Sequence, residues 1–167
     1  MKILVTGSSG LLGSEIKKIY HNYNFDWIFS SKEQLDLLNS NNISTILSEI
    51  NPDIIINCAA FTDVDAAEIY PELANKLNCK AVECIAKWSH LYKCKLIHIS
   101  TDYVFDGTKK IAYTEQDITN PLSIYGKTKL AGEEALKIIN PKNCIIIRTS
   151  WIFSKIGKNL LSFSITH

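Results

Sequence analysis

The chain lacks the features by which several classes of protein are recognised. Its 167 residues contain no long run of lysine or arginine and carry a net charge of +1, whereas nucleic-acid binding needs clustered cations. No apolar run approaches the ~20 residues of a membrane span. Gly7 and Gly10 interrupt the apolar start, which argues against a signal peptide. We therefore expect no nucleic-acid partner, no membrane partner and a cytoplasmic location.

The cysteines and histidines form no pattern typical of a disulfide framework or a metal site. Five cysteines are an odd number, no two are spaced as CxxC, and no histidine lies at a spacing suited to zinc. We expect the thiols to be reduced and predict no metal site. His98 occupies one position of an apolar strand, so we interpret it as a packed imidazole rather than a ligand.

What the chain does contain is a regular alternation of apolar strands and helical segments. The expected strands are rich in isoleucine, valine and leucine, as buried parallel strands tend to be, and cover residues 2–6, 26–29, 54–58, 95–100 and 144–148. Pro71 fits the first turn of a long helix through about Tyr92, and Asn140 with Pro141 ends a later helix. The alternation predicts an α/β fold, a Rossmann-like doubly wound parallel sheet with helices on both faces, as one domain over residues 1–167.

A glycine-rich turn follows the first strand. Residues 7–13 read GSSGLLG and lead into an apolar pattern with helical spacing. Glycines let the backbone approach a ligand closely, and a helix N-terminus offers free N–H groups to a pyrophosphate. The strand, turn and helix in this order predict dinucleotide binding, although such turns also occur where only packing is needed.

Two later segments carry the residue types of an active site. Residues 100–107 read STDYVFDG and follow an apolar strand, so Thr101 is expected at the carboxyl end of that strand, where open α/β sheets bind ligands. Residues 125–129 read YGKTK, which places Tyr125 and Lys129 one helical turn apart on the same face. An ammonium ~4 Å from a phenolate, at an effective dielectric of ~20, stabilises it by roughly 4 kcal/mol, and Tyr125 would then titrate near neutrality. The alternative is a half-buried ring beside a solvated amine.

These segments together resemble the extended short-chain dehydrogenase/reductases, and within them the dTDP-4-dehydrorhamnose reductase family. The wider group is indicated by the GxxGxxG turn and by Tyr125 with Lys129, with Thr101 in the place of the usual serine or threonine. The narrower family is indicated by STDYVFDG, by NCAAFTDVDAAE at residues 57–68, and by RTSW at residues 148–151. The resemblance extends over nearly all of the chain.

The resemblance implies roles for three groups of residues. The catalytic residues would be Tyr125 as proton donor, Lys129, which lowers the tyrosine pKa and holds the nicotinamide ribose, and Thr101, which bonds near the substrate carbonyl. Cofactor contacts would come from Gly7, Gly10, Leu11, Leu12, Gly13, Asp36, Leu37, Ala59, Ala60, Phe61, Thr62, Tyr125 and Lys129, with Asn78 supporting the strand beneath the cofactor. Substrate contacts would come from Thr101, Asp102, Tyr103 and Trp151; the alternative for Trp151 is a core aromatic at a strand end.

The cofactor preference depends on the residues after the second strand. NAD-specific folds carry an acid there that binds the ribose 2′-hydroxyl, but residues 28–32 read IFSSK. The hydroxyls of Ser30 and Ser31 and the ammonium of Lys32 suit a 2′-phosphate, so we expect NADPH, with NADH as a second option. Some family members bind Mg²⁺ through glutamates at a dimer interface. Glu15 matches one such position, which leaves a homodimer open, but its partners would lie past His167 and we do not predict the metal.

The resemblance implies NADPH-dependent reduction of the C4 ketone of dTDP-4-dehydro-6-deoxy-L-mannose, giving dTDP-L-rhamnose for cell-surface polysaccharide. Family members continue into a carboxyl-terminal region that covers the nucleotide sugar and is missing here, and Leu160, Leu161 and Phe163 only begin a further helix. The sequence is therefore also compatible with a truncated non-catalytic remnant, with a dinucleotide-binding regulatory subunit, and with a reductase of another nucleotide-4-ketosugar. We expect this chain to bind NADPH weakly, to reduce the ketosugar negligibly and to self-associate.

Overall fold

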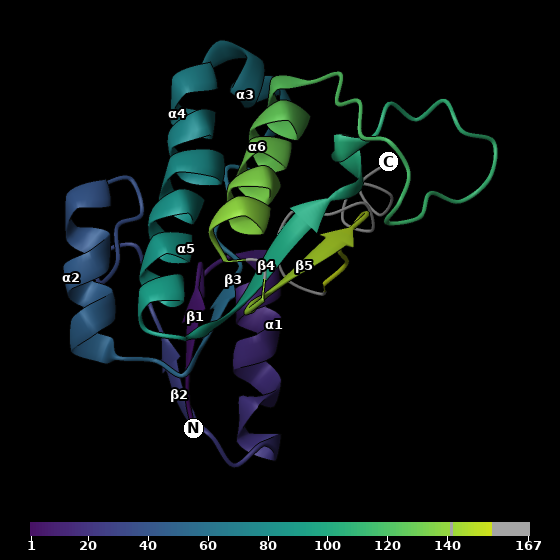
Figure 1. Ribbon diagram of the computed structural model, residues 1–167. Helices are drawn as coiled ribbons and strands as arrows, with labels where there is room; N and C mark the ends of the chain where they lie inside the picture. The colour runs from purple at the N-terminus through teal and green to yellow at the C-terminus, as the bar shows by residue number, and fades with distance from the viewer. Residues whose placement is uncertain (141, 155–167) are drawn as a thin grey trace.

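A parallel sheet lies at the centre of the computed structural model, which describes residues 1–140 and 142–154 (Figure 1). In the order in which they lie side by side, its strands are β2 (Asp26–Phe29), β1 (Lys2–Thr6), β3 (Ile54–Asn57), β4 (Lys95–Thr101) and β5 (Cys144–Thr149). Every adjacent pair is parallel. The chain first runs outward to β2 and then returns across β1, so the order reverses between β1 and β3. Open α/β sheets bind ligands at such a switch point, beside the carboxyl ends of the strands.

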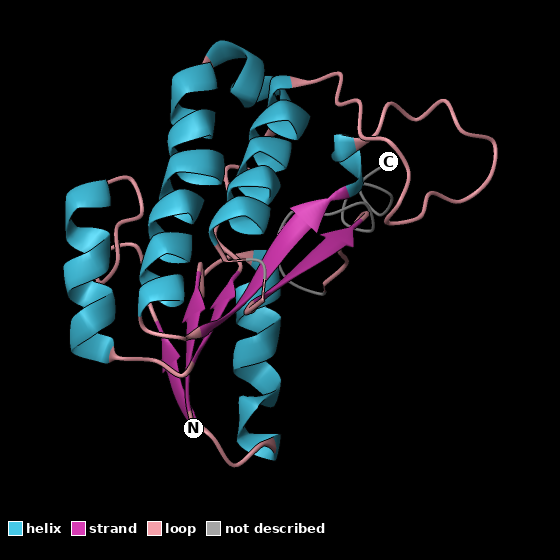
Figure 2. Ribbon diagram, viewed as in Figure 1, coloured by secondary structure: helices cyan, strands magenta, loops and turns pink. Residues whose placement is uncertain are grey.

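Helices cover the two faces of the sheet unequally (Figures 1 and 2). Helix α1 (Leu11–Ile19) connects β1 to β2 and continues into a 3₁₀ turn, η1 (Tyr20–Asn22). The connections from β2 to β3, from β3 to β4 and from β4 to β5 cross the sheet in the direction opposite to that from β1 to β2. Because parallel crossovers are right-handed, these connections lie on the opposite face. Their helices are α2 (Ser40–Ile50), α3 (Val64–Ile69), α4 (Pro71–Asn75), α5 (Ala81–Leu91) and α6 (Ile124–Ile139). Helix α5 packs between α2 and α6.

A π-helical turn, η2 (Lys76–Lys80), joins α4 to α5, so the two form one continuous helix. The helix begins at Pro71, as its sequence predicts, but the widened turn was not expected. Single π turns inside α-helices are frequent at functional sites. Asn78 lies in this turn, and its contacts are described with the site below.

The apolar core lies between the sheet and the helices α2, α5 and α6. Its fully buried members come from both layers and include Leu4, Ile55, Ile43, Leu47, Ile85 and Leu136. Each such side chain contributes about 1.5–3 kcal/mol by leaving water. The same buried face of α6 also carries Tyr125, Lys129 and Glu133, so packing of this helix brings polar groups to the carboxyl edge of the sheet.

The structure confirms the predicted α/β class, with a parallel sheet and helices on both faces. The strand bounds agree closely with the expected ones, and β4 extends to Thr101, which therefore lies at the carboxyl end of its strand. A 3₁₀ turn, η3 (Asp102–Val104), follows immediately. Leu160, Leu161 and Phe163 lie outside the described residues.

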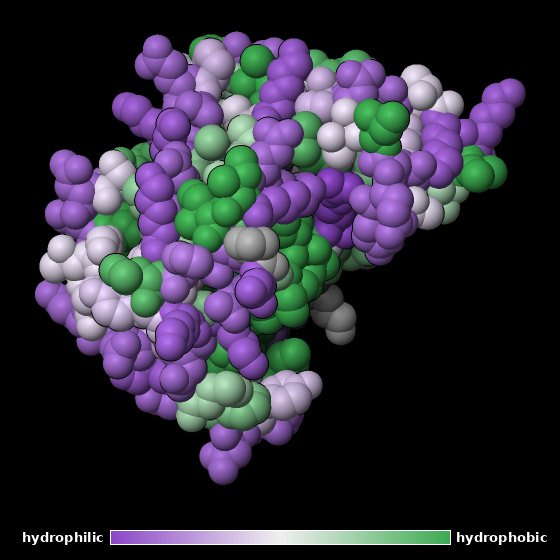
Figure 3. Space-filling view, viewed as in Figure 1, coloured by the Kyte–Doolittle hydropathy of each residue, from purple (hydrophilic) through white to green (hydrophobic). Residues whose placement is uncertain are grey.

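Strand β5 exposes apolar side chains on the face turned away from the core. Ile145 is 60% exposed and Ile147 is 42% exposed, whereas Ile146 between them packs on the core. Figure 3 shows hydrophobic side chains gathered where Figure 1 places β4 and β5. Within the described residues, no helix other than α1 lies on that face of the sheet.

None of the helices in residues 1–140 and 142–154 is long and apolar enough to cross a membrane.

Candidate cofactor and active site

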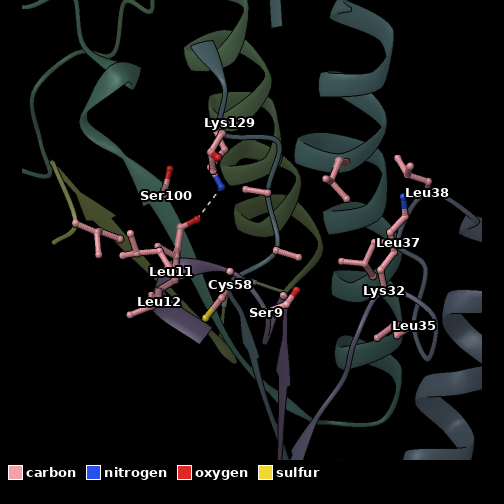
Figure 4. A pocket seen from close by; sticks show the side chains of 18 of the residues that line it. Ser9, Leu11, Leu12, Lys32, Leu35, Leu37, Leu38, Cys58, Ser100 and Lys129 are labelled. Carbon is pink, nitrogen blue, oxygen red and sulfur yellow. Dashed lines mark hydrogen bonds between the residues drawn. The ribbon is translucent and has the colours of Figure 1, made fainter. Parts of the chain in front are cut away.

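A cavity of about 500 Å³ opens at the carboxyl edge of β1, β3 and β4 (Figure 4). Most of the residues predicted to contact a cofactor line it, namely Gly7, Gly10, Leu11, Leu12, Asp36, Leu37, Ala59, Ala60, Thr62, Tyr125 and Lys129. In Figure 4, Leu11 and Leu12 form one wall, Lys32, Leu35, Leu37 and Leu38 form the other, and Ser9 and Cys58 lie between them. The cavity spans the switch point between β1 and β3, where the topology predicts a ligand.

The glycine-rich turn packs closely against the start of the loop that follows β3. Gly7 has a φ of +63°, and a Cβ atom placed on it would lie 2.7 Å from both the Cα and the N of Ala59. Gly13 does not line the cavity but packs against the turn itself, since a Cβ there would lie 2.4 Å from the Gly7 carbonyl oxygen. Gly10 is the N-cap of α1, and no side chain caps the N–H groups of that helix. The turn therefore offers uncapped backbone donors beside the cavity, which suits a pyrophosphate.

Helix α6 is fixed at its first turn by a side-chain cap and a close backbone contact. The Gly126 N–H donates to Ser123 Oγ over 3.0 Å. A Cβ on Gly126 would lie 2.3 Å from the Tyr103 carbonyl oxygen, so α6 can approach η3 only with glycine at this position. The Tyr125 ring then meets the Tyr103 ring edge to face, with centroids 5.5 Å apart. These contacts set the position of Tyr125 beside the end of β4.

The electrostatic surroundings of Tyr125 differ from the sequence prediction. Burial raises the pKa of the Tyr125 phenol, the nearby Asp102 carboxylate raises it further, and a hydrogen bond with Thr101 lowers it. The expected strong lowering by Lys129 is absent in this structure, because the Lys129 amine is directed to other partners. Tyr125 is thus a protonated phenol at neutral pH, next to the hydroxyl of Thr101.

Lys129 is almost completely buried, with 2% of its surface exposed. Its Nζ donates to the Ile99 carbonyl oxygen over 2.7 Å, the interaction dashed in Figure 4, and lies 3.3 Å from His98 Nε2. Burial lowers the pKa of Lys129 to about 8, opposed by the negative charge of Glu133. A lysine with this pKa exists in both protonation states near neutral pH.

A buried ion pair connects α6 to the two strands beside it. Glu133, one turn after Lys129, accepts a hydrogen bond from Ser100 Oγ over 2.6 Å and two from Arg148, at 2.9 and 2.7 Å. The Arg148 guanidinium also lies over the Phe105 ring, 4.9 Å from its centroid. These hydrogen bonds hold the pKa of Glu133 below its usual range in spite of burial. The charged pair holds α6 against β4 and β5.

Asn78 holds the loop after β3 by both ends of its side chain. The Phe61 N–H donates to Asn78 Oδ1 over 2.8 Å, and Asn78 Nδ2 donates to the Phe61 carbonyl oxygen over 3.0 Å and to Thr128 Oγ1 over 3.1 Å. From the sequence, Asn78 was expected to support the strand beneath the cofactor, whereas its side chain holds the loop that follows β3. Phe61 itself packs beside Tyr125 and does not line the cavity, unlike its neighbours Ala60 and Thr62.

The segment after β2 contributes two of its three predicted polar groups to the cavity. Ser31 and Lys32 line it, together with Ser9 from the glycine turn. Ser30 was also expected to face a 2′-phosphate, but this prediction is wrong. Ser30 is 3% exposed, its hydroxyl donates to the Val5 carbonyl oxygen, and its own carbonyl accepts from Ser8 Oγ over 2.8 Å.

The residues expected to contact the sugar do not line one common cavity. Asp102 and Tyr103 line a second cavity of about 310 Å³, whereas Thr101 is 6% exposed and lines neither cavity. Trp151 follows β5 with a φ of +45° and is 61% exposed, so the alternative of a core aromatic is wrong. Trp151 does not line either cavity in the described part of the chain.

Sequence reasoning missed several residues of the site. Cys58, between β3 and Ala59, lines the cavity, and burial raises the pKa of its thiol to about 12. Its position directly after a buried strand, at the carboxyl edge where ligands bind, was the feature of the sequence that could have predicted this role. His98 was interpreted only as a packed imidazole, yet it contacts Lys129. Glu15, the expected magnesium position, forms an ion pair with Lys18 at 2.6 Å.

The switch-point cavity, the glycine turn and the sheet define a Rossmann-like α/β domain. Residues 1–166 match the family model described as RmlD substrate binding domain, and the chain belongs to this family. It is 42% identical over 163 residues to a dTDP-4-dehydrorhamnose reductase of Salmonella typhimurium, covering 95% of this chain but 54% of that protein. The chain thus spans about half the length of this relative.

Two further comparisons bear on the cofactor and on the activity. The solved structure of dTDP-4-dehydrorhamnose reductase from Bacillus anthracis, in complex with NADP, matches with a TM-score of 0.93 at 36% identity, over 99% of this chain and 59% of that one. A Bos taurus protein named methionine adenosyltransferase 2 subunit beta is 36% identical over 164 residues, covering 94% of this chain and 48% of that protein.

Proposed function

We propose that this chain binds NADPH in the 500 Å³ cavity and provides the catalytic residues that reduce dTDP-4-dehydro-6-deoxy-L-mannose to dTDP-L-rhamnose, for cell-surface polysaccharide. The observation that carries the proposal is that Tyr125 and Lys129 line the same cavity as the Gly7 turn, at the switch point of the sheet. The Salmonella relative, named for this reaction, and the NADP complex of the Bacillus relative support it.

The cavity fits a dinucleotide phosphate. The crowded Gly7 turn and the uncapped start of α1 would hold the pyrophosphate, and Ser31 and Lys32 would hold the 2′-phosphate. When bound, NADPH supplies the hydride that adds to the carbonyl carbon of the substrate. Lys129 would donate to a ribose hydroxyl with the N–H that Ile99 and His98 leave free.

The side chains of this chain would supply the proton that the carbonyl oxygen of the substrate takes up. As negative charge develops on the carbonyl oxygen, the Tyr125 phenol gives it a proton, and the Thr101 hydroxyl stabilises the phenolate that forms. The raised pKa of Tyr125 keeps the phenol protonated until this step.

A second function is favoured by one observation, the likeness to a subunit of methionine adenosyltransferase. In that case the chain would bind the dinucleotide as a regulatory part of another enzyme and would not reduce a ketosugar. Both functions share the cofactor cavity. They differ in whether Tyr125 acts as an acid, so turnover distinguishes them.

The proposal is tested in two steps. NADPH binding to the 167-residue chain is measured by nucleotide fluorescence, and the absence of saturable binding would contradict both functions. Turnover is then measured in a chimera that joins residues 1–154 to the remaining half of the Salmonella relative, with dTDP-4-dehydro-6-deoxy-L-mannose and a second dTDP-4-ketosugar as substrates. NADPH oxidation with the first substrate supports the reductase. Faster reduction of the second substrate would change the substrate, and cofactor binding without turnover would favour the regulatory subunit.

A further inference from the structure

A row of buried polar side chains crosses the sheet behind Lys129. Thr6, Asn57 and His98 occupy paired register positions on β1, β3 and β4. Each is at most 1% exposed. Thr6 Oγ1 donates to Asn57 Oδ1 over 2.6 Å, Asn57 Nδ2 lies 3.0 Å from His98 Nδ1, and His98 Nε2 lies 3.3 Å from Lys129 Nζ. The row connects the first strand of the sheet to the lysine of the site.

The direction of these hydrogen bonds depends on the proton of Lys129. Asn57 Nδ2 donates to His98 Nδ1 in this arrangement, so the proton of the neutral imidazole is on Nε2, facing Lys129. Two donors would then oppose each other if Lys129 were an ammonium. The arrangement is satisfied when Lys129 is a neutral amine, whose lone pair accepts from His98 Nε2–H.

A charged Lys129 requires the opposite arrangement. Its ammonium has only donors, so His98 Nε2 must accept and the imidazole proton must be on Nδ1. Nδ1–H then needs an acceptor, which Asn57 supplies if its carboxamide turns to present the oxygen to His98 and the NH₂ to Thr6. The Thr6 hydroxyl serves both arrangements, because it can donate or accept.

We propose that Thr6, Asn57 and His98 form a reversible hydrogen-bond relay that holds the Lys129 amine in one place in both of its protonation states. The inference rests on the proposed function, in that Asn57 and His98 are positioning residues for the lysine of that reaction. Each state places a donor opposite an acceptor at all three contacts of the row. If the row lacked the Thr6 hydroxyl, which can donate or accept, or the Asn57 carboxamide, which can turn, its hydrogen bonds would suit only one protonation state of Lys129.

The proton balance of the relay is simple. From the neutral state, His98 passes its Nε2 proton to Lys129, and a proton from solvent water is taken up at His98 Nδ1 once the Asn57 carboxamide has turned. The pair gains one proton in total and His98 remains neutral. Burial lowers the pKa of His98 well below its usual range, and the charge of Lys129 lowers it further, so both effects favour the neutral imidazole. The other titratable groups that act on Lys129 are Glu133 and Cys58, and neither belongs to the row.

The relay is tested by NMR on the 167-residue chain without any cofactor. Long-range ¹H–¹⁵N spectra report the tautomer of His98, and lysine labelled with ¹³C at Cε reports the titration of Lys129. We expect the proton of His98 to be on Nδ1 at low pH and on Nε2 at high pH, with the same midpoint as the Lys129 titration. A tautomer that stays the same across the Lys129 titration would overturn the relay.

Two variants sharpen the measurement. Lys129→Met removes the titrating amine, so the tautomer of His98 should no longer depend on pH; a persistent change would assign it to another group and refute the relay. Asn57→Leu removes the reversible carboxamide and should displace the Lys129 midpoint from the wild-type value, whereas an unchanged midpoint would contradict the role of Asn57. The wild-type titration decides the matter if either variant fails to fold. Because no nucleotide or ketosugar is used, these outcomes are independent of NADPH binding and turnover.

Discussion

Gly7 and Ala59 approach each other so closely that the site has no room for a Cβ atom on residue 7. That atom would lie 2.7 Å from the Ala59 backbone, and the φ of +63° at Gly7 is itself unfavourable for other residues. The contact brings the turn after β1 against the loop after β3. It thereby creates the edge of the cavity at which a pyrophosphate would lie.

Gly7→Ala is expected to abolish NADPH binding and to destabilise the chain by more than the strain of a positive φ alone, which costs about 1–3 kcal/mol. Gly107→Ala is the matched control, because Gly107 also has a positive φ, of +74°, but no atom lies within 4 Å of its Cβ position. Fluorescence titration and urea unfolding measure the two effects. Equal losses in both variants would show that crowding against Ala59 is unimportant.

Tyr125→Phe is expected to lower the kcat of the chimera by about 10²–10⁴-fold and to leave NADPH binding nearly intact, because only the phenol hydroxyl supplies the proton. Tyr92→Phe, at an exposed position after α5, serves as the control and should retain full activity. Steady-state rates and nucleotide titrations are the measurements. If the variant kept more than about a tenth of the wild-type kcat, Tyr125 could not be the acid.

Lys32→Ala is expected to weaken NADPH binding relative to NADH, because Lys32 lines the cavity after β2 and residues 28–32 contain no acid. An exposed charged contact contributes about 0.5–1 kcal/mol, so the expected change in the ratio of the two dissociation constants is about two- to fivefold. Lys110→Ala, at an exposed position away from the cavity, should leave the ratio unchanged. Tighter binding of NADH than NADPH by the wild-type chain would show that the interpretation of this segment is wrong.

The stability of the chain is expected to depend on pH through Lys129. Its pKa is about 8 in the folded chain and 10.5 in the unfolded chain, so between these values the unfolded state binds more protons. The free energy of unfolding therefore rises with pH across this window, by up to about 3 kcal/mol, and the penalty of the buried charge is fully present below pH 8.

Lys129→Met isolates this contribution. Buried thiols such as Cys58, with its pKa raised to about 12, act in the opposite direction above pH 9, so the difference between wild type and variant is the useful quantity. Urea unfolding of both proteins from pH 7 to pH 10 measures it. A difference that stayed constant over this range would mean that folding does not lower the pKa of Lys129.

The sequence predicts the fold well because apolar strands and helices are local patterns. It also places Thr101 at a strand end and Tyr125 with Lys129 on one face of α6, since both follow from the period of the element. The direction of the Lys129 amine could not be predicted in this way. The direction depends on the Ile99 carbonyl and on His98, which belong to β4 and not to α6. From the sequence alone these two residues were interpreted only as apolar or packed positions of a strand.

The same limit explains the other differences. Ser30 and Ser31 are adjacent and chemically identical, and only their burial in the folded chain separates a hydroxyl bonded to Val5 from one that lines the cavity. The hydrogen bonds of Asn78 likewise join it to Phe61 and Thr128, which are 17 and 50 residues away in the sequence.

The polar row through Thr6, Asn57 and His98 has a consequence for the alignment of the sheet. Side chains alternate along a strand, so a slip of β3 by one residue would turn Asn57 to the opposite face and leave Thr6 and His98 without partners inside the core. The neighbouring residues of β3 are isoleucines, among which apolar packing alone discriminates poorly. A shift of β3 by one residue would thus leave several buried polar groups without hydrogen-bond partners at once. These three side chains therefore favour the native register over shifted registers that apolar packing alone would hardly distinguish.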